Sequence, residues 1–99
     1  MNISIQYVKM PESDTLTQYC TARLEKLTKK YDWITQAQVF FKYEKEASGM
    51  DKICEIELSA PGPRIYASSK EKNFEMAVKE TLSDLNKQLK KRKALFTRH

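Results

Sequence analysis

The sequence has few of the residues that most catalytic and metal sites require. Its 99 residues include one histidine, His99, two cysteines and only two glycines, Gly49 and Gly62. Two isolated glycines exclude a glycine-rich phosphate loop, and a zinc site would need more ligands than two cysteines supply. Because Cys20 and Cys54 each lie in an apolar pattern, we expect two buried free thiols.

Residue pairs suited to acid–base or nucleophilic catalysis are also scarce. Glu55 and Glu57 share one face of an expected strand, but we expect that face to be open and without a pocket. A cysteine–histidine pair would depend on His99, the last residue of the sequence. We therefore expect no enzymatic activity, no catalytic residue, no metal and no cofactor.

Long hydrophobic runs are missing as well. The sequence has no apolar run of about 18 residues or more, and no basic segment followed by an apolar leader. We therefore expect a cytoplasmic protein that does not enter a membrane. The composition, 40% hydrophobic and 10% aromatic, is that of a folded domain. Its length suits one modest core, so we expect residues 1–99 to form a single domain.

The sequence does contain clear periodic patterns. Alternating apolar and polar residues predict four strands, over residues 2–8, 35–44, 52–60 and 64–69. Helical spacing predicts a first helix from Asp14 to Lys30, with Ser13 as its N-cap. The same spacing predicts a second helix along the run from Lys70 to Lys93, with an apolar stripe from Phe74 to Leu89.

The order of these elements indicates the architecture. The helix between the first two strands is long enough for a parallel crossover. A polar hairpin loop over residues 45–51 and a tight turn at Pro61-Gly62-Pro63 connect the other strands as an antiparallel meander. The prediction is an α+β fold with two layers, β-α-β-β-β-α, in which two helices pack on one face of a four-stranded mixed sheet.

Positive charge is the feature that bears on function. The sequence has 18 Lys and Arg against 13 Asp and Glu, a net charge of +5, and no acidic residue from Lys87 to Arg98. Helices that lie side by side would join their outer faces, including Lys72, into one basic surface. Such a surface attracts phosphates without reading bases, which favours folded RNA over DNA. The candidate RNA-binding residues are Arg23, Lys26, Lys29, Lys30, Lys79, Lys87, Lys90 and Lys91.

Several segments together resemble a known family. They are the opening strand Ile3 to Tyr7, the helix residues Leu16, Tyr19 and Leu24 to Leu27, and the stretches 65–69, 73–78 and 85–91. In this pattern the chain resembles the short form of the ribosome hibernation-promoting factors, also called sigma-54 modulation or ribosome-associated inhibitor proteins. It departs from the family at Asn73 and Lys79, where Asp is usual, and at Glu75, where Tyr is usual.

The resemblance implies a function. It implies binding to the small ribosomal subunit and its rRNA in the channel for messenger and transfer RNA, which blocks translation under stress. It also implies one ribosome-binding domain over residues 1–99, without a C-terminal dimerisation domain, and we expect a monomer off the ribosome. Within the candidate set, Lys87, Lys90 and Lys91 match the family's basic run.

Two alternatives remain open at this point. The first is another structured-RNA-binding module, because double-stranded-RNA-binding domains also place two helices on one face of a sheet. The second is a protein-interaction domain that uses the open face of the sheet. There Phe40, Ile53 and Tyr66 would form an exposed apolar patch.

Overall fold

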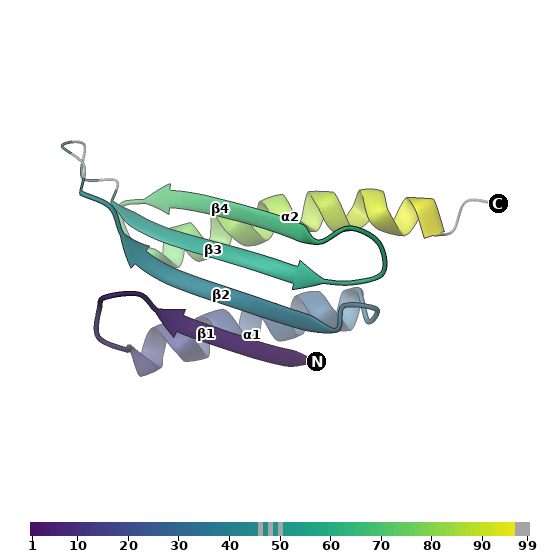
Figure 1. Ribbon diagram of the computed structural model, residues 1–99, viewed down its shortest axis with the longest axis horizontal. Coiled ribbons are helices and arrows are strands. Elements are labelled where there is room, and N and C mark those ends of the chain that lie inside the picture. Colours follow the sequence, from purple (N-terminus) through teal and green to yellow (C-terminus); the bar gives the residue numbers. More distant parts are fainter. Residues whose placement is uncertain (46, 48, 50, 97–99) are drawn as a thin grey trace.

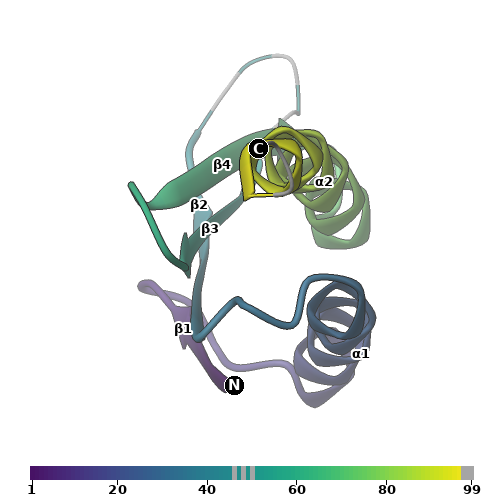
Figure 2. The same cartoon turned by 90° about the vertical axis from the view of Figure 1, so that its right-hand side faces the viewer.

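The computed structural model describes residues 1–45, 47, 49 and 51–96. The elements are β1 (Asn2–Tyr7), α1 (Asp14–Lys30), β2 (Gln36–Tyr43), β3 (Lys52–Ser59), β4 (Ile65–Glu71) and α2 (Phe74–Phe96). The strands form one mixed sheet in the order β1-β2-β3-β4, in which β1 is parallel to β2 and the other pairs are antiparallel. Both helices cover the same face of the sheet (Figure 1, Figure 2). The predicted α+β fold is confirmed.

The first helix has the predicted bounds and the predicted cap. Ser13 has an extended backbone, and its side chain accepts a hydrogen bond from the backbone N–H of Leu16 at 3.3 Å. Asp14 in the first turn and Lys29 and Lys30 in the last turn complement the helix dipole. Short-range signals therefore determine both ends of α1.

The second helix begins later than its sequence pattern predicts. Lys70 and its neighbour Glu71 belong to β4, and Lys72 lies in the bend before the helix, so its predicted place on the helix face is wrong. The reason is the cap: the side chain of Asn73 accepts a hydrogen bond from the N–H of Met76 at 2.8 Å. Asn73 stands where Asp is usual in the family that the sequence resembles, and its side chain still binds a free N–H group of the first turn.

The end of the second helix also differs, since α2 continues past Lys93 to Phe96. The ring of Phe96 packs edge-on against Trp33, with 4.9 Å between the ring centroids. This contact joins the end of α2 to the segment that follows α1, and a helical pattern alone does not reveal it. Arg98 and His99 lie outside the described residues, as do positions 46, 48 and 50 of the predicted hairpin loop.

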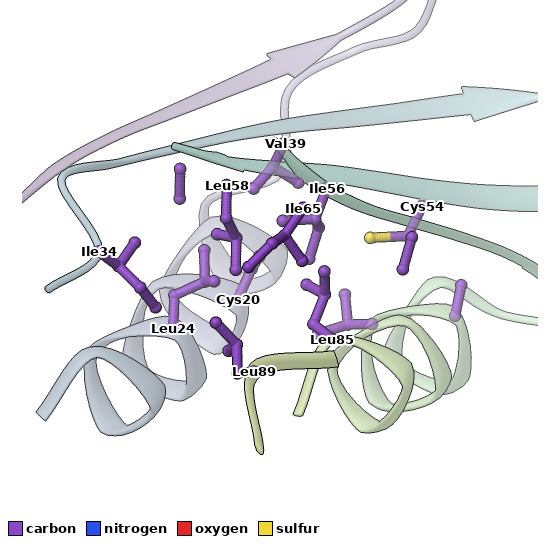
Figure 3. Packing of buried hydrophobic residues seen from close by; sticks show 14 of the residues in the cluster. Cys20, Leu24, Ile34, Val39, Cys54, Ile56, Leu58, Ile65, Leu85 and Leu89 are labelled. Atoms are coloured by element: carbon purple, nitrogen blue, oxygen red, sulfur yellow. The ribbon is translucent and has the colours of Figure 1, made fainter. Parts of the chain in front are cut away.

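One hydrophobic core fills the space between the sheet and the helices (Figure 3). The strands contribute rows of inward side chains, such as Val39 beside Ile56, and the helices contribute Leu24 and Leu85. Cys20 and the second cysteine of the chain are buried and free, as predicted. No helix in the described part of the chain is both long and apolar enough to cross a membrane.

Candidate nucleic-acid interface

The two helices run side by side on one face of the sheet (Figure 2). A groove lies between them, and residues of both helices line it. Its volume is about 350 Å³. The lining consists of Arg23, Lys26, Leu27, Lys30, Lys79, Leu82, Ser83 and Asn86. Side chains from both helices therefore form a single site.

The groove brings together four of the eight predicted RNA-binding residues. Arg23, Lys26 and Lys30 come from α1 and Lys79 comes from α2. The lining includes no acidic residue, and Leu27 contributes apolar surface beside the cations. Positive charge from two elements thus converges without an internal counter-charge, which is the arrangement that attracts phosphate groups.

The other four predicted residues, Lys29, Lys87, Lys90 and Lys91, are exposed but do not line the groove. Lys90 follows Lys79 by about three helical turns and so continues the same side of α2. Lys91 lies on the opposite flank of α2, on the side of Gln88. This flank faces β4, because the side-chain amide of Gln88 donates a hydrogen bond to the backbone oxygen of Tyr66. These four lysines add exposed positive charge outside the groove.

Tyrosines support the cations of this surface. The guanidinium of Arg23 lies 4.5 Å from the centre of the Tyr19 ring. The ammonium groups of Lys30 and Lys93 lie 5.5 and 6.0 Å from the centre of the Tyr31 ring. Such contacts favour a positive charge at these positions.

Sequence reasoning missed the polar residues of the groove and one cation beside it. Ser83 and Asn86 line the groove, and Asn86 accepts a hydrogen bond from the hydroxyl of Tyr31 at 3.0 Å. Their spacing of four and seven residues from Lys79 was the available signal, because it places all three on one side of α2. Lys93 contacts the ring of Tyr31, and this contact joins distant parts of the chain.

Arg92 belongs to the same basic stretch of sequence but has a structural role. Its guanidinium donates hydrogen bonds to the backbone oxygens of Pro61 at 2.7 Å and Pro63 at 2.9 Å. Gly62 lies between them with φ of +95°, and a side chain there would meet Arg92 at 2.9 Å. This arginine therefore fixes the turn between β3 and β4.

Ion pairs occupy the open face of the sheet. Lys42 binds Glu55 at 2.8 Å, which raises the pKa of the lysine, and Arg64 binds Glu57. Both carboxylates considered for catalysis are thus paired with cations. Within the described residues, none of the eight predicted RNA-binding residues forms an ion pair.

The prediction of an exposed apolar patch on this face is wrong for one of its three residues, Ile53. Ile53 is only 6% exposed, although it does not belong to the core cluster. It lies between Lys42 and Lys70 in the strand register, and long lysine stems cover apolar surface in this way. Tyr66 is 49% exposed and Phe40 is half-buried, so Ile53 does not join them as an exposed residue.

Comparison with known proteins connects this geometry to a family. The family described as sigma 54 modulation protein / S30EA ribosomal protein matches residues 3–95. A ribosome hibernation promoting factor of Pseudomonas putida is 30% identical over 93 residues, which span 94% of this chain and 85% of that protein.

Solved structures share the fold. A ribosomal subunit interface protein from Coxiella burnetii matches with a TM-score of 0.85 at 23% identity, over 95% of this chain and 99% of the other. The N-terminal domain of Protein Y from Thermus thermophilus matches with a TM-score of 0.76 at 21% identity, over 92% and 98% of the two chains. At these identities the likeness concerns the arrangement of the backbone.

Proposed function

The chain belongs to the sigma 54 modulation protein / S30EA ribosomal protein family, and from this premise we propose that it binds the small ribosomal subunit in the decoding channel. Family membership makes it a ribosome-binding regulator of translation and not an enzyme. In the proposed role it acts in the cytoplasm, where ribosomes are, and it is a monomer when it is not bound to them.

The observation that carries the proposal is the basic groove between α1 and α2. Arg23, Lys26, Lys30 and Lys79 meet there without an acidic residue in the lining. In the proposed complex these groups bind rRNA phosphates, and the lysines outside the groove extend the contact. Phosphate contacts hold a protein in one register and orientation on its RNA without reading the sequence.

The proposed inhibition is steric. A folded domain that is anchored in the decoding channel by phosphate contacts occupies the space that messenger and transfer RNA need. No chemical step is required, in agreement with the absence of a catalytic constellation from the sequence. The idle ribosome is released when the contacts to the rRNA are broken.

Competition on purified small subunits tests this proposal. Bound protein should be displaced by messenger RNA together with transfer RNA, because all of them require the same channel. Duplex RNA of equal length and concentration is the matched competitor, and it should displace little. If duplex RNA displaces the protein as well as messenger and transfer RNA do, the chain is a general structured-RNA binder and the proposal is wrong.

A further inference from the structure

The two edges of the sheet are protected very differently. At the β4 edge, Gln88 of α2 donates a hydrogen bond to the backbone oxygen of Tyr66 at 2.8 Å, and Arg92 binds the turn before this strand. The other edge is β1, and no described residue pairs with its outer side. Its six residues, Asn2–Tyr7, carry no charge. An uncharged and uncovered edge is available to a further strand.

The register of β1 shows which backbone groups are available. The N–H of Asn2 binds the oxygen of Thr35 at 3.3 Å, and the N–H of Val8 binds the oxygen of Phe41 at 2.9 Å. In a parallel ladder the even-numbered residues of β1 therefore face β2. The N–H and C=O groups of Ile3, Ile5 and Tyr7 point the opposite way, toward the open edge.

A second groove lies beside this edge, between β1 and α1. Its volume is about 360 Å³, and it is lined by Ile3, Ile5, Tyr7, Glu12, Asp14, Thr17 and Thr21. Two contacts hold the Tyr7 side chain in this lining: its hydroxyl donates to the backbone oxygen of Ser13 at 2.9 Å and lies 2.8 Å from the hydroxyl of Thr17. Alternate side chains of an added strand would enter this groove.

The charge of this groove is opposite to that of the helix groove. Its lining includes two acids, Glu12 and Asp14, and no basic residue, although the whole chain has a net charge of +5. A basic side chain at one end of an added strand would meet these carboxylates. The acids thus discriminate against nucleic acid and favour a basic peptide.

We propose that the β1 edge binds an extended segment of a partner protein, which adds a fifth strand to the sheet. The segment has small apolar or hydroxyl side chains at alternate positions, and a basic side chain next to Glu12. Backbone hydrogen bonds from Ile3, Ile5 and Tyr7 supply affinity, and the groove with its two acids supplies selectivity. This site is separate from the RNA-binding surface and does not rest on the proposed function.

Amide chemical shifts of ¹⁵N-labelled protein test the proposal with a synthetic probe. The probe is a six-residue peptide of alternating Val and Thr, with two lysines at each end. We expect saturable shifts that are largest at Ile3, Ile5 and Tyr7. A twin with glutamates at both ends should bind more weakly, and a twin with every core amide N-methylated should not bind.

Matched variants of the protein separate this site from general charge effects. Glu12→Lys should weaken probe binding by about three-fold or more, because an attraction becomes a repulsion. Glu80→Lys makes the same charge change on α2 and should have little effect. Equal effects of E12K and E80K, or largest shifts in the helix groove or on the open sheet face, would overturn the proposal. A dimer would also overturn the proposal if sedimentation detects it and the amide shifts place its contact at β1, because a second copy of the chain would then occupy the edge.

Discussion

At the residue scale, the basic side chains divide by what they contact. Lys42 and Arg64 are paired with acids on the sheet, and Arg92 is bound to two backbone oxygens. Lys26 and Lys79 line the groove without an ion pair to any described residue. Sequence charge alone does not separate these groups, because the contacts join residues that are far apart in the chain.

Tyr31 links the two helices, and its hydroxyl can be removed without removing the ring. Tyr31→Phe deletes the hydrogen bond to Asn86 and should lower the free energy of unfolding by about 1 kcal/mol. Urea denaturation measures this change. Tyr66→Phe is the matched control, because Tyr66 is 49% exposed. Equal losses in the two variants would contradict the structural role of Tyr31.

The buried cysteines predict a dependence of stability on pH. Burial raises the pKa of the Cys20 thiol from 9.0 to about 12, and burial is also the main cause that raises the pKa of the Cys54 thiol to about 12. Between about pH 9 and about pH 12 the folded protein keeps the thiol protons, whereas the unfolded chain has released them. Stability should therefore be unaffected by the thiols below about pH 9 and should fall as the pH rises above it, by up to about 1.4 kcal/mol per pH unit for each thiol.

Urea denaturation from about pH 8 to about pH 10.5 checks this expectation. The comparison is with Cys20→Ala, which keeps every other ionisable group and should lose less stability over the same interval. If the two proteins have the same pH dependence above about pH 9, the effect assigned to this thiol is wrong.

At the element scale, sequence predicted those features that depend on neighbouring residues. The bounds of α1 follow from Ser13, Asp14 and the apolar spacing, and they agree with the structure. The start of α2 was placed too early because Lys70 fits a helical pattern as well as a strand. Its end was placed too early because the contact of Phe96 with Trp33 joins distant segments.

The turn between β3 and β4 is held in place by Arg92 of α2. Arg92→Ala removes the hydrogen bonds to Pro61 and Pro63 and should lower the free energy of unfolding by about 1 kcal/mol or more. The adjacent Lys91→Ala is the control and should cost little, because Lys91 is exposed. Chemical denaturation of both variants measures the difference. A loss in K91A as large as that in R92A would show that the turn contact is unimportant.

At the scale of the whole molecule, the open sheet face and the helix groove differ in charge. The open sheet face holds ion pairs such as Lys42 with Glu55, whereas every charged side chain that lines the helix groove is a cation. Sequence predicted that the helices share a basic surface, since the topology places them side by side. It did not predict which cations converge, because this depends on the rotation of each helix about its axis.

The lysines outside the groove should contribute to ribosome binding without supporting the fold. Replacing Lys87, Lys90 and Lys91 by Ala should weaken binding to small subunits and leave the free energy of unfolding within about 0.5 kcal/mol of wild type. Sedimentation with small subunits and urea denaturation measure the two quantities. Full binding by the folded triple variant would exclude these three lysines from the interface.

The salt dependence of small-subunit binding tests the central claim most directly. If about five basic groups neutralise phosphates, the logarithm of the affinity should fall against the logarithm of salt concentration with a slope of roughly −3.5 to −4.5. The groove variant K26Q/K30Q/K79Q should flatten this slope by about 2 to 2.7. The control K9Q/K45Q/K72Q removes the same charge from positions that do not line the groove and should keep the wild-type slope. Binding that is insensitive to salt, or a groove variant with the wild-type slope, would contradict the account.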